Sequence, residues 1–229
     1  MTATGTQPTV LVVEDDPAIR ETTTLLLERF GFTVVAVADG QAGLDAFRAA
    51  TPRIALLDVM LPHIDGISLT RMIREVATTP IVLLSARSDP LDVIAGLEAG
   101  ADDYVTKPFE GNVLVARLRA VLRRADRLGP DPAEASRMRF GELEVDPAGM
   151  AATVSGRRVH LTATEARLLT ELARHAGIVL TREQLLQRVW DYAWGGDTRL
   201  VDVHIQRLRA KIGAEAITTV RGAGYKLAR

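Results

Sequence analysis

The chain has 229 residues, of which 47% are hydrophobic and 25% charged, a length and composition that suit two small packed domains. It contains no cysteine, which excludes disulfides, thiolate metal sites and thiol catalysis. The N-terminal residues resemble no signal peptide, and no stretch approaches the roughly 20 apolar residues of a membrane helix. We therefore expect a cytoplasmic protein with no membrane partner.

The net charge of −1 is unevenly distributed along the chain. Residues 1–124 carry 12 Lys and Arg against 16 Asp and Glu, whereas residues 195–229 carry 7 against 3. A basic C-terminal segment is typical of nucleic-acid binding, although a solvated charged surface explains a few extra arginines equally well. The charge alone leaves both interpretations open.

Short apolar runs in the first half of the chain alternate with helical patterns. The runs are Val10–Val13, Val34–Val37, Ile54–Leu57, Ile81–Leu84 and Tyr104–Thr106. Asp16 and Pro17 provide a helix N-cap and a proline in the first turn, while Gly31 and Gly100 fall where helices should end. Five such strand–helix units predict an α/β fold, a five-stranded, doubly wound parallel sheet with helices on both faces.

Acidic residues follow two of these predicted strands directly. Glu14 and Asp15 come after the first strand, and Asp58 ends the third. The carboxyl ends of central parallel strands meet at one edge of the sheet, where two like charges about 4 Å apart repel by roughly 4 kcal/mol at an effective dielectric of 20. Either Lys107, after the fifth strand, or a hard divalent cation such as Mg²⁺ is expected to offset this repulsion.

Asp58 is the unusual residue, because burying an unpaired carboxylate costs several kcal/mol. A carboxylate beside Mg²⁺ can accept a phosphoryl group, and Lys107 with the Ser85 hydroxyl would stabilise the oxygens during transfer. Taken alone, Asp58 could simply begin a turn, and Asp16 is better explained as an N-cap than as a metal ligand. The prediction that Asp58 is a phosphoacceptor depends on the whole set of residues at the strand ends, and not on Asp58 alone.

Four motifs resemble the receiver domain of two-component response regulators, in the family's order and across residues 9–124. They are VVEDD (12–16), LLDVMLP (56–62), LSAR (84–87) and GADDYVTKPF (100–109). The resemblance implies a flavodoxin-like sheet and phosphorylation of Asp58 by a sensor histidine kinase. The implied site consists of Asp15, Asp58 and the Met60 carbonyl as Mg²⁺ ligands with Glu14 nearby, Lys107 and Ser85 on the phosphoryl group, and a cis Lys107–Pro108 bond. Tyr104 would be the switch aromatic, although an ordinary strand tyrosine is the alternative.

The second half begins after a polar segment, residues 125–138, whose two prolines are typical of a linker; residues 1–8 are expected to be disordered. Strands are predicted at about 139–145, 151–154 and 158–161, helices after the capping boxes 162–165 and 181–184 and over 198–212, and a final strand pair within 217–227. The mixture predicts a second, α+β domain over 139–229.

The predicted helix 198–212 has two distinct sides. Its apolar stripe consists of Val201, Ile205, Leu208 and Ile212, which should be buried. The opposite side carries Arg199, Asp202, Gln206 and Arg209, flanked by His204 and Arg207. These residue types read base edges in a major groove, and Arg221 near the following turn suits a wing on the DNA backbone or minor groove. A solvated helix surface explains the same pattern equally well.

Four further motifs resemble the winged-helix output domain of the OmpR/PhoB subfamily. They are TATEARLL (162–169), LTREQLL (180–186), VDVHIQRLR (201–209) and TVRGAGY (219–225). The resemblance implies a winged helix-turn-helix transcription factor that binds tandem half-sites in double-stranded DNA as a dimer. The implied DNA-binding residues are Arg199, Asp202, Arg207 and Arg209 in the groove or on phosphates, His204 and Tyr225 on the backbone, and Arg221 in the wing. The loop 190–197 would face RNA polymerase, with Trp190 in the core.

In this subfamily the receiver dimerises through its fourth helix, fifth strand and fifth helix, using salt bridges between subunits. The matching charged residues are Asp102, Asp103, Arg117 and Arg124. Val93 and Val113 occupy the positions of one further charged pair. We therefore expect a homodimer on phosphorylation in which an apolar contact replaces that pair.

Two rival functions use the same residues. An aspartyl-phosphate phosphatase requires a second acid two residues after the nucleophile, where this chain has Met60. We therefore expect no enzyme, beyond self-phosphorylation and self-dephosphorylation at Asp58. A DNA-binding regulator that works without phosphate is the other rival, and the acid cluster with Ser85 and Lys107 argues against it.

Overall fold

The computed structural model of the chain describes residues 7–86, 90–126, 137–191 and 197–228. Contacts within the chain define two compact units, Met1–Leu122 and Arg123–Arg229. Most of the predicted linker and of the N-terminal residues 1–8 lies outside the described residues. In the part of the chain that is described, no helix has both the length and the apolar character needed to cross a bilayer.

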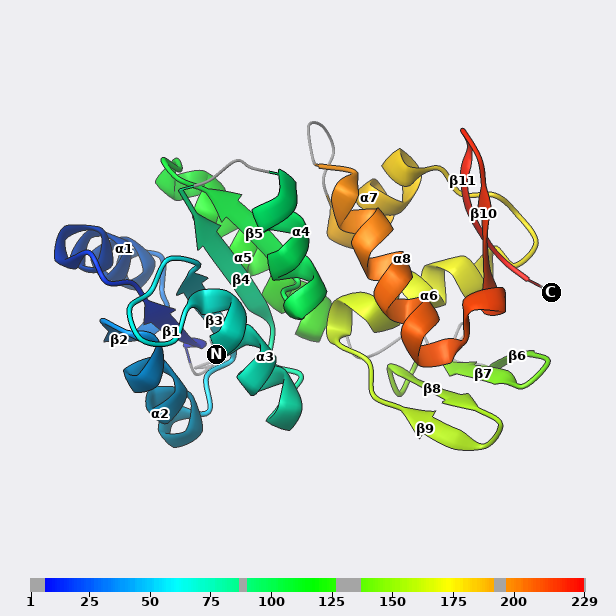
Figure 1. Cartoon of the computed structure of the whole chain (residues 1–229), viewed down its shortest axis with the longest axis horizontal. Coiled ribbons are helices and arrows are strands. Elements are labelled where there is room, and N and C mark those ends of the chain that lie inside the picture. The colour runs from blue at the N-terminus through cyan, green and yellow to red at the C-terminus, as the bar shows by residue number, and fades with distance from the viewer. Residues whose placement is uncertain (1–6, 87–89, 127–136, 192–196, 229) are drawn as a thin grey trace, which may run out of the picture. The chain divides into compact units, whose positions relative to one another are not determined.

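The first unit is a five-stranded parallel sheet with helices on both faces (Figure 1). Its strands are β1 (Thr9–Val13), β2 (Thr33–Val37), β3 (Ile54–Asp58), β4 (Ile81–Ser85) and β5 (Asp103–Thr106). Its helices are α1 (Pro17–Arg29), α2 (Gly40–Ala50), α3 (Gly66–Val76), α4 (Pro90–Ala99) and α5 (Gly111–Asp126). The strand order is β2-β1-β3-β4-β5, which confirms the predicted doubly wound α/β fold.

The central strands β1, β3 and β4 are buried on both sides because they are apolar at nearly every position. Successive strand residues point to opposite faces. On one face Leu56 and Leu84 share a core with Leu27 of α1 and Leu118 of α5. The order of the strands places β1 next to β3, with Val13 in register with Leu57, so the residues that follow these two strands lie at the same edge of the sheet.

Helix α1 begins immediately beyond that edge. The Asp16 side chain accepts hydrogen bonds from the backbone N–H groups of Ala18 (2.8 Å) and Ile19 (3.0 Å), and Pro17 follows as the first helical residue. This confirms Asp16 as an N-cap. Because the helix starts here, Glu14 and Asp15 are confined to the short connection between β1 and α1.

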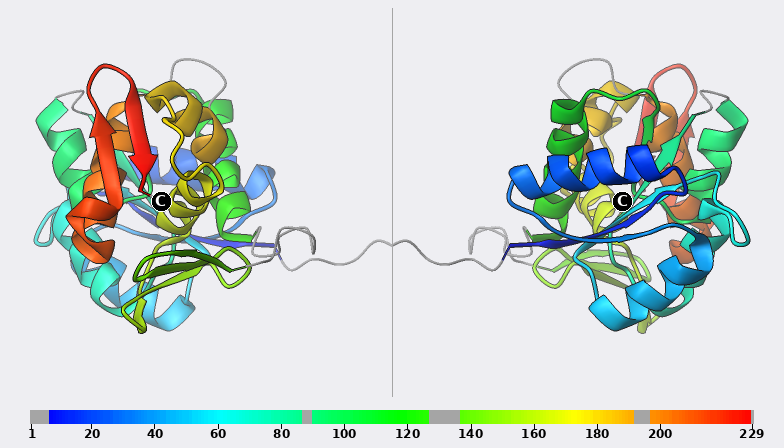
Figure 2. Two further views of the ribbon diagram at one scale, coloured as in Figure 1. Left: turned by 90° about the vertical axis from the view of Figure 1, so that its right-hand side faces the viewer. Right: turned by 90° about the vertical axis from the view of Figure 1, so that its left-hand side faces the viewer.

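The second unit combines three helices with two small antiparallel sheets. Strands β6 (Met138–Phe140), β7 (Leu143–Asp146), β8 (Ala151–Val154) and β9 (Arg157–Val159) form one sheet, and β10 (Ile217–Val220) and β11 (Gly224–Leu227) form the other. The helices are α6 (Ala163–Arg174), α7 (Arg182–Trp190) and α8 (Arg199–Ile212), followed by a 3-10 turn, Ala214–Ala216. In both views of Figure 2 the β10–β11 hairpin stands apart from the four-stranded sheet. The predicted α+β winged-helix class is confirmed.

Local sequence signals explain where the helices of this unit begin. Both predicted capping boxes are present: Thr162 and Glu165 exchange side-chain and backbone hydrogen bonds at the start of α6, and Thr181 and Gln184 do the same at α7. The predicted apolar stripe of α8 is buried along its whole length, at Val201, Ile205, Leu208 and Ile212.

The hairpin is attached to the helices through its glycine. Gly224 adopts φ +148°, and a Cβ there would overlap the carbonyl oxygen of Leu180. This close approach lets Leu180 and Tyr225 exchange backbone hydrogen bonds of 2.9 and 3.0 Å. The segment before α7 is thereby joined to β11, which fixes the position of the hairpin relative to the helices.

Candidate metal centre and nucleic-acid interface

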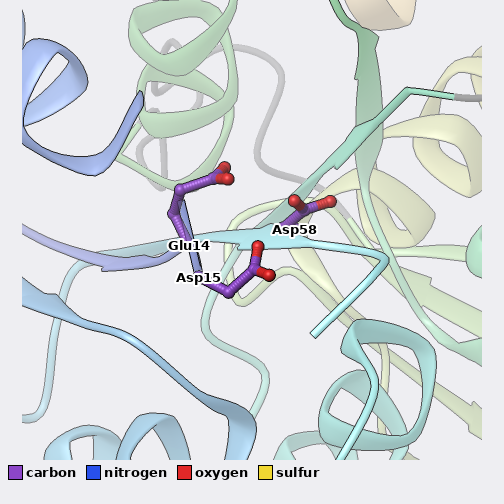
Figure 3. A group of neighbouring side chains, drawn as sticks. All are labelled: Glu14, Asp15 and Asp58. Atoms are coloured by element: carbon purple, nitrogen blue, oxygen red, sulfur yellow. The ribbon is translucent and has the colours of Figure 1, made fainter. Parts of the chain in front are cut away.

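Three carboxylates converge at the carboxyl ends of β1 and β3 (Figure 3). Ligand atoms of Glu14, Asp15 and Asp58 all lie within 4.8 Å of one another. Glu14 and Asp58 are buried, with 1% and 5% of their surface exposed, whereas Asp15 is exposed. The predicted acid cluster is therefore present, and it is open to solvent on the Asp15 side.

Lys107 lies between the two buried carboxylates. Its Nζ donates hydrogen bonds of 2.6 Å to both Glu14 Oε2 and Asp58 Oδ2. Burial raises the pKa of Glu14, and the nearby charge of Asp58 raises it further, while Lys107 opposes both effects. Burial acts to lower the pKa of Lys107, but its hydrogen bonds to Asp58 and Glu14 outweigh burial and raise it. Lys107 is therefore held in its charged form.

The carboxylates also fit a divalent cation. Glu14 Oε1 is buried and has no hydrogen-bond partner among the described residues, although a buried carboxylate oxygen normally requires one. Carboxylate oxygens that face a common space are the ligands that Mg²⁺ prefers. A cation held by Glu14, Asp15 and Asp58 would supply the positive charge that Oε1 lacks. The first unit therefore has the acidic pocket typical of divalent metal binding.

The backbone around Asp58 is fixed by two close contacts. The Met60 N–H donates to Asp58 Oδ1 at 3.1 Å, which brings the Met60 backbone to the pocket, while its side chain remains exposed. A Cβ on Gly66 would overlap the carbonyl oxygen of Asp58, so only glycine allows α3 to start this close to β3. Asp58 is therefore positioned by its own loop as well as by Lys107.

The other predicted residues of this site lie at neighbouring strand ends. Ser85 ends β4, is 4% exposed, and its carbonyl accepts a 2.7 Å hydrogen bond from the Lys107 N–H. The Lys107–Pro108 peptide bond is cis, as the family resemblance implies. Tyr104 lies in β5 and is half-buried; its role as a switch stays a prediction.

Arg20 also belongs to the site, although no motif in the sequence predicted it. Its Nη1 donates to the carbonyl oxygens of Glu14 (2.7 Å) and Asp15 (3.0 Å). The guanidinium thus holds the connection that carries both acids. A signal was available, because Arg20 lies one turn into a helix that starts just after the acids, and a long side chain there reaches back over the helix start.

Helix α8 presents the predicted polar side, but its residues are engaged within the domain. Arg199 pairs with Asp197 at 2.6 Å, Asp202 with Arg182 at 2.7 Å. Arg209 donates to the Ile217 carbonyl at 2.6 and 3.0 Å and to Thr219 Oγ1 at 2.8 Å. The charged groups of this helix are therefore held in defined positions. Arg221 at the hairpin turn is exposed.

Arg207 was expected to contact DNA, but the structure directs it inward. Its side chain is 11% exposed, and its guanidinium lies 2.8 Å from Oε1 of the fully buried Glu165. Lys211 approaches the other oxygen of Glu165 at 2.6 Å. Burial acts to raise the pKa of Glu165, but Arg207 and Lys211 outweigh it and lower the pKa. In this structure Arg207 joins α8 to α6 and does not face outward.

Two residues that were expected to contact the DNA backbone, His204 and Tyr225, are buried in this structure. His204 is fully buried, its Nδ1 donates a hydrogen bond of 2.8 Å to the Leu200 carbonyl, and its ring packs edge-on against Trp190. Tyr225 is 5% exposed, and its hydroxyl donates to Asp202 at 2.7 Å. Helical periodicity alone could not show that Trp190 would cover the His204 side of α8. Trp190 itself lies in the core as expected, while residues 192–196 of the 190–197 loop are outside the described residues.

The charged residues expected at a receiver dimer interface are paired within the first unit. Asp102 is 1% exposed and 2.8 Å from Arg74 of α3, and Asp103 is fully buried and 3.4 Å from Arg117. Both aspartates therefore have partners in their own domain in this structure, and their expected role between subunits stays a prediction. The Arg124 side chain lies outside the described residues.

The two valines of the expected interface differ in exposure. Val113 on α5 is 43% exposed, whereas Val93 on α4 is 5% exposed. Val113 alone offers the open apolar surface that a contact with a second subunit requires. A contact between Val93 and Val113 across a dimer interface stays a prediction.

Together, the doubly wound sheet with three acids and a lysine at its carboxyl edge defines a receiver domain, and the second unit defines a winged-helix DNA-binding domain. Family models agree: residues 10–119 match the response regulator receiver domain, and residues 156–227 match the C-terminal domain of transcriptional regulatory proteins. The chain belongs to the two-component response regulators of the OmpR/PhoB type, and it is a transcriptional regulator with a DNA-binding domain.

Relatives match along nearly the whole chain. Transcriptional regulatory protein CseB of Streptomyces avermitilis is 61% identical over 230 residues, covering 96% of this chain and 98% of CseB. DNA-binding response regulator MtrA of Mycobacterium tuberculosis is 44% identical over 222 residues, covering 95% of each. The crystal structure of response regulator DrrB, a Thermotoga maritima OmpR/PhoB homolog, is 34% identical with a TM-score of 0.52, covering 97% of this chain and 100% of DrrB.

Proposed function

We propose that the chain is switched on by phosphorylation of Asp58 and then binds tandem promoter sites as a dimer. The phosphoryl group would come from the phosphohistidine of a sensor histidine kinase. An Asp58 carboxylate oxygen forms the new bond to phosphorus, the phosphorus–nitrogen bond breaks, and the histidine nitrogen leaves. The supporting observation is that Lys107 Nζ lies 2.6 Å from Asp58 in a pocket with two further acids.

Each residue of the pocket has a distinct part in this proposal. Glu14, Asp15, Asp58 and the Met60 carbonyl would hold Mg²⁺, which neutralises charge on the phosphoryl oxygens. Lys107 would move from its bridging position to a phosphoryl oxygen, with the Ser85 hydroxyl on another. Tyr104 would then respond to the movement of Ser85. Because the phosphoryl group ends on the chain's own Asp58 side chain, we infer that the protein is a regulator and not an enzyme that turns over a substrate.

The second unit would deliver the output. We infer that α8 lies in the major groove and that Arg221 reaches the adjacent backbone, since the charged side of α8 and the exposed hairpin arginine belong to one compact domain. RNA polymerase is the further partner proposed for the loop 190–197. A role on chromosomal DNA also places the protein in the cytoplasm.

The phosphoacceptor is tested with a small phosphodonor. The full chain is incubated with acetyl phosphate and Mg²⁺, and the gain of one phosphoryl group is followed by intact-mass spectrometry. We expect labelling of the wild type and of Asp45→Asn, an exposed aspartate of α2, and no labelling of Asp58→Asn. Labelling of Asp58→Asn at another residue would contradict the assignment of Asp58.

The switch is tested on DNA upstream of the protein's own gene. Wild type, with and without acetyl phosphate, is compared with Asp58→Asn in a footprinting titration. Tighter binding of labelled wild type, with two adjacent protected segments, supports the proposal. Equal binding by labelled and unlabelled protein would instead favour the regulator that works without phosphate.

A further inference from the structure

The three carboxylates of the acid pocket differ in what holds them in place. Asp58 Oδ1 accepts a hydrogen bond from the Met60 N–H at 3.1 Å. Lys107 Nζ lies 2.6 Å from oxygens of both Glu14 and Asp58. The Asp15 carboxylate, by contrast, has no hydrogen bond or ion pair with any residue that the structure describes. Its direction therefore depends on the backbone that carries it.

Arg20 of α1 holds that backbone. Its Nη1 carries two N–H groups and donates to the carbonyl oxygen of Glu14 at 2.7 Å and to that of Asp15 at 3.0 Å. These two carbonyls belong to the peptide groups on either side of the Asp15 Cα. One guanidinium nitrogen thus fixes both peptide planes, and with them the direction in which the Asp15 side chain leaves the backbone. In Figure 3 that side chain turns toward the same space as those of Glu14 and Asp58.

The helix itself gains little from an arginine at this position. Arg20 is the fourth residue of α1, which begins at Pro17, and the partial positive charge of a helix N-terminus disfavours a cation there. The Asp16 side chain already caps the first turn. The stability of α1 therefore does not explain the position of Arg20, whereas its contacts with the connection that carries the acids do.

The effect of Arg20 on a bound metal has two opposing parts. A guanidinium close to a divalent cation repels it, which lowers affinity. Ligands that are held in position before binding lose less conformational freedom when the ion arrives, which raises affinity. Because the two parts differ in sign, the metal affinity of a variant without this guanidinium shows which part dominates.

We propose that Arg20 is a positioning residue for the metal centre, and that its Nη1 raises the affinity for divalent cations by orienting Asp15. The inference rests on the proposed Mg²⁺ site and adds to it a side chain that, as a cation, is no metal ligand itself. The ordering of Asp15 outweighs the repulsion between the guanidinium and the ion.

The test measures metal binding directly and without phosphorylation. Mn²⁺, which takes the same oxygen ligands as Mg²⁺, is titrated into the unphosphorylated full chain. The free ion is followed by electron paramagnetic resonance, with Mg²⁺ as the competitor, and Asp15→Asn defines the binding that belongs to this site. We expect Arg20→Gln to bind both ions about tenfold more weakly or worse, the usual loss when a group that orients a metal ligand is removed.

Two further variants separate geometry from charge. Arg20→Lys keeps the charge but replaces the planar fork by a single ammonium group, so its affinity should fall between those of wild type and Arg20→Gln. Arg29→Gln is the matched control, since Arg29 is an exposed arginine at the end of the same helix. It removes the same charge without touching the acid connection, and it should bind Mn²⁺ as wild type does.

Unfolding distinguishes positioning from a purely structural role. Urea unfolding of the full chain is followed by far-UV circular dichroism in EDTA and in Mg²⁺. An arginine that only stabilised the fold would shift the midpoint of Arg20→Gln equally in both, and that result would overturn the proposal. We expect a larger shift in Mg²⁺, because the variant also loses stabilisation that the bound ion supplies to the folded state.

The outcomes separate this inference from the metal site on which it rests. Equal Mn²⁺ binding by wild type and Asp15→Asn overturns the site itself. If Asp15→Asn loses the ion while Arg20→Gln binds it as tightly as wild type or more tightly, only the role of Arg20 is overturned. Should Arg20→Gln fail to fold, Arg20→Lys decides the matter, and wild-type affinity in that variant overturns the inference.

Discussion

Lys107 explains why two buried carboxylates can lie side by side at the edge of the sheet. Without its charge, Glu14 and Asp58 would repel each other in a poorly solvated pocket, and burial already raises the pKa of Glu14. The sequence alone is compatible with either a lysine or a cation offsetting this repulsion. In the structure Lys107 contacts both acids. Glu14 Oε1 has no hydrogen-bond partner among the described residues, so the site also has room for a cation.

Replacing Lys107 by Met should make the receiver domain depend on divalent cations. Removing one member of a buried ion pair costs about 3–5 kcal/mol, so we expect a loss of this size in EDTA. Mg²⁺ should restore part of it, because it supplies charge to the same carboxylates. The measurement is urea unfolding of the full chain followed by far-UV circular dichroism, with EDTA or Mg²⁺.

The control for this experiment is Lys226→Met, which removes the same charge from β11 in the second unit. It should show no greater dependence on Mg²⁺ than wild type. A Lys107→Met variant whose unfolding in EDTA matches that of wild type would show that Lys107 does not stabilise the acid cluster.

At the scale of the elements, Glu165 connects the first helix of the winged-helix domain to α8. It caps α6 through Thr162, and it pairs with Arg207 and Lys211 of α8 while its own surface is fully buried. We expect Glu165→Gln to destabilise this domain by about 3–5 kcal/mol, because two cations lose their buried partner. Urea unfolding followed by Trp190 fluorescence reports on this domain alone, since both tryptophans of the chain lie in its second half.

The same pairing predicts a response to acid. In the folded chain the pKa of Glu165 is lowered below its ordinary value of 4.5, so below pH 4.5 the unfolded chain takes up the proton first. The stabilisation of the folded domain by Glu165 is therefore fully present above pH 4.5. It is lost as the pH falls through the lower pKa of the folded state. Glu165→Gln should show less of this loss than wild type, whereas Glu215→Gln, at an exposed position, should behave as wild type. Equal acid sensitivity in all three would contradict the assignment.

These elements also show what the sequence could and could not predict. Periodicity located the buried stripe from Val201 to Ile212, and capping boxes located two helix starts, because both signals are local. The sequence indicated only a capping role for Glu165, since its partner Arg207 is 42 positions away. The sequence likewise suggested that Asp102 is a surface charge, because its partner Arg74 belongs to another helix. Pairings over such distances depend on how the elements pack, which one sequence does not reveal.

At the scale of the whole molecule, the proposed switch requires that a change at Asp58 alter the surface that α4, β5 and α5 present. The charged residues expected on that surface are largely used within the domain, where Arg74 and Arg117 hold Asp102 and Asp103. An apolar contact therefore gains importance in any dimer formed there. Val113 is the exposed apolar residue of α5 that the sequence analysis placed at that contact.

Changing Val113 to Asp should weaken the phosphorylated dimer. In a two-fold interface the same residue contributes from both subunits, so the substitution introduces two like charges where two valines had met. Burying a valine contributes about 1.5 kcal/mol or more, whereas an exposed salt bridge contributes about 0–1 kcal/mol. The wild-type dimer should therefore be little affected by salt, and Val113→Asp should weaken it by about tenfold, or 1.4 kcal/mol, or more.

Light scattering of the phosphorylated full chain over a range of protein and salt concentrations measures this dimer. Val113 is preferred to Val93 as the site of change because Val93 is 5% exposed, and a charge there would disturb the subunit itself. Val76→Asp is the matched control, since Val76 is an exposed valine at the end of α3, outside the expected interface. If Val113→Asp dimerises as tightly as Val76→Asp, the chain uses another surface, and the apolar replacement of the charged pair has no part in assembly.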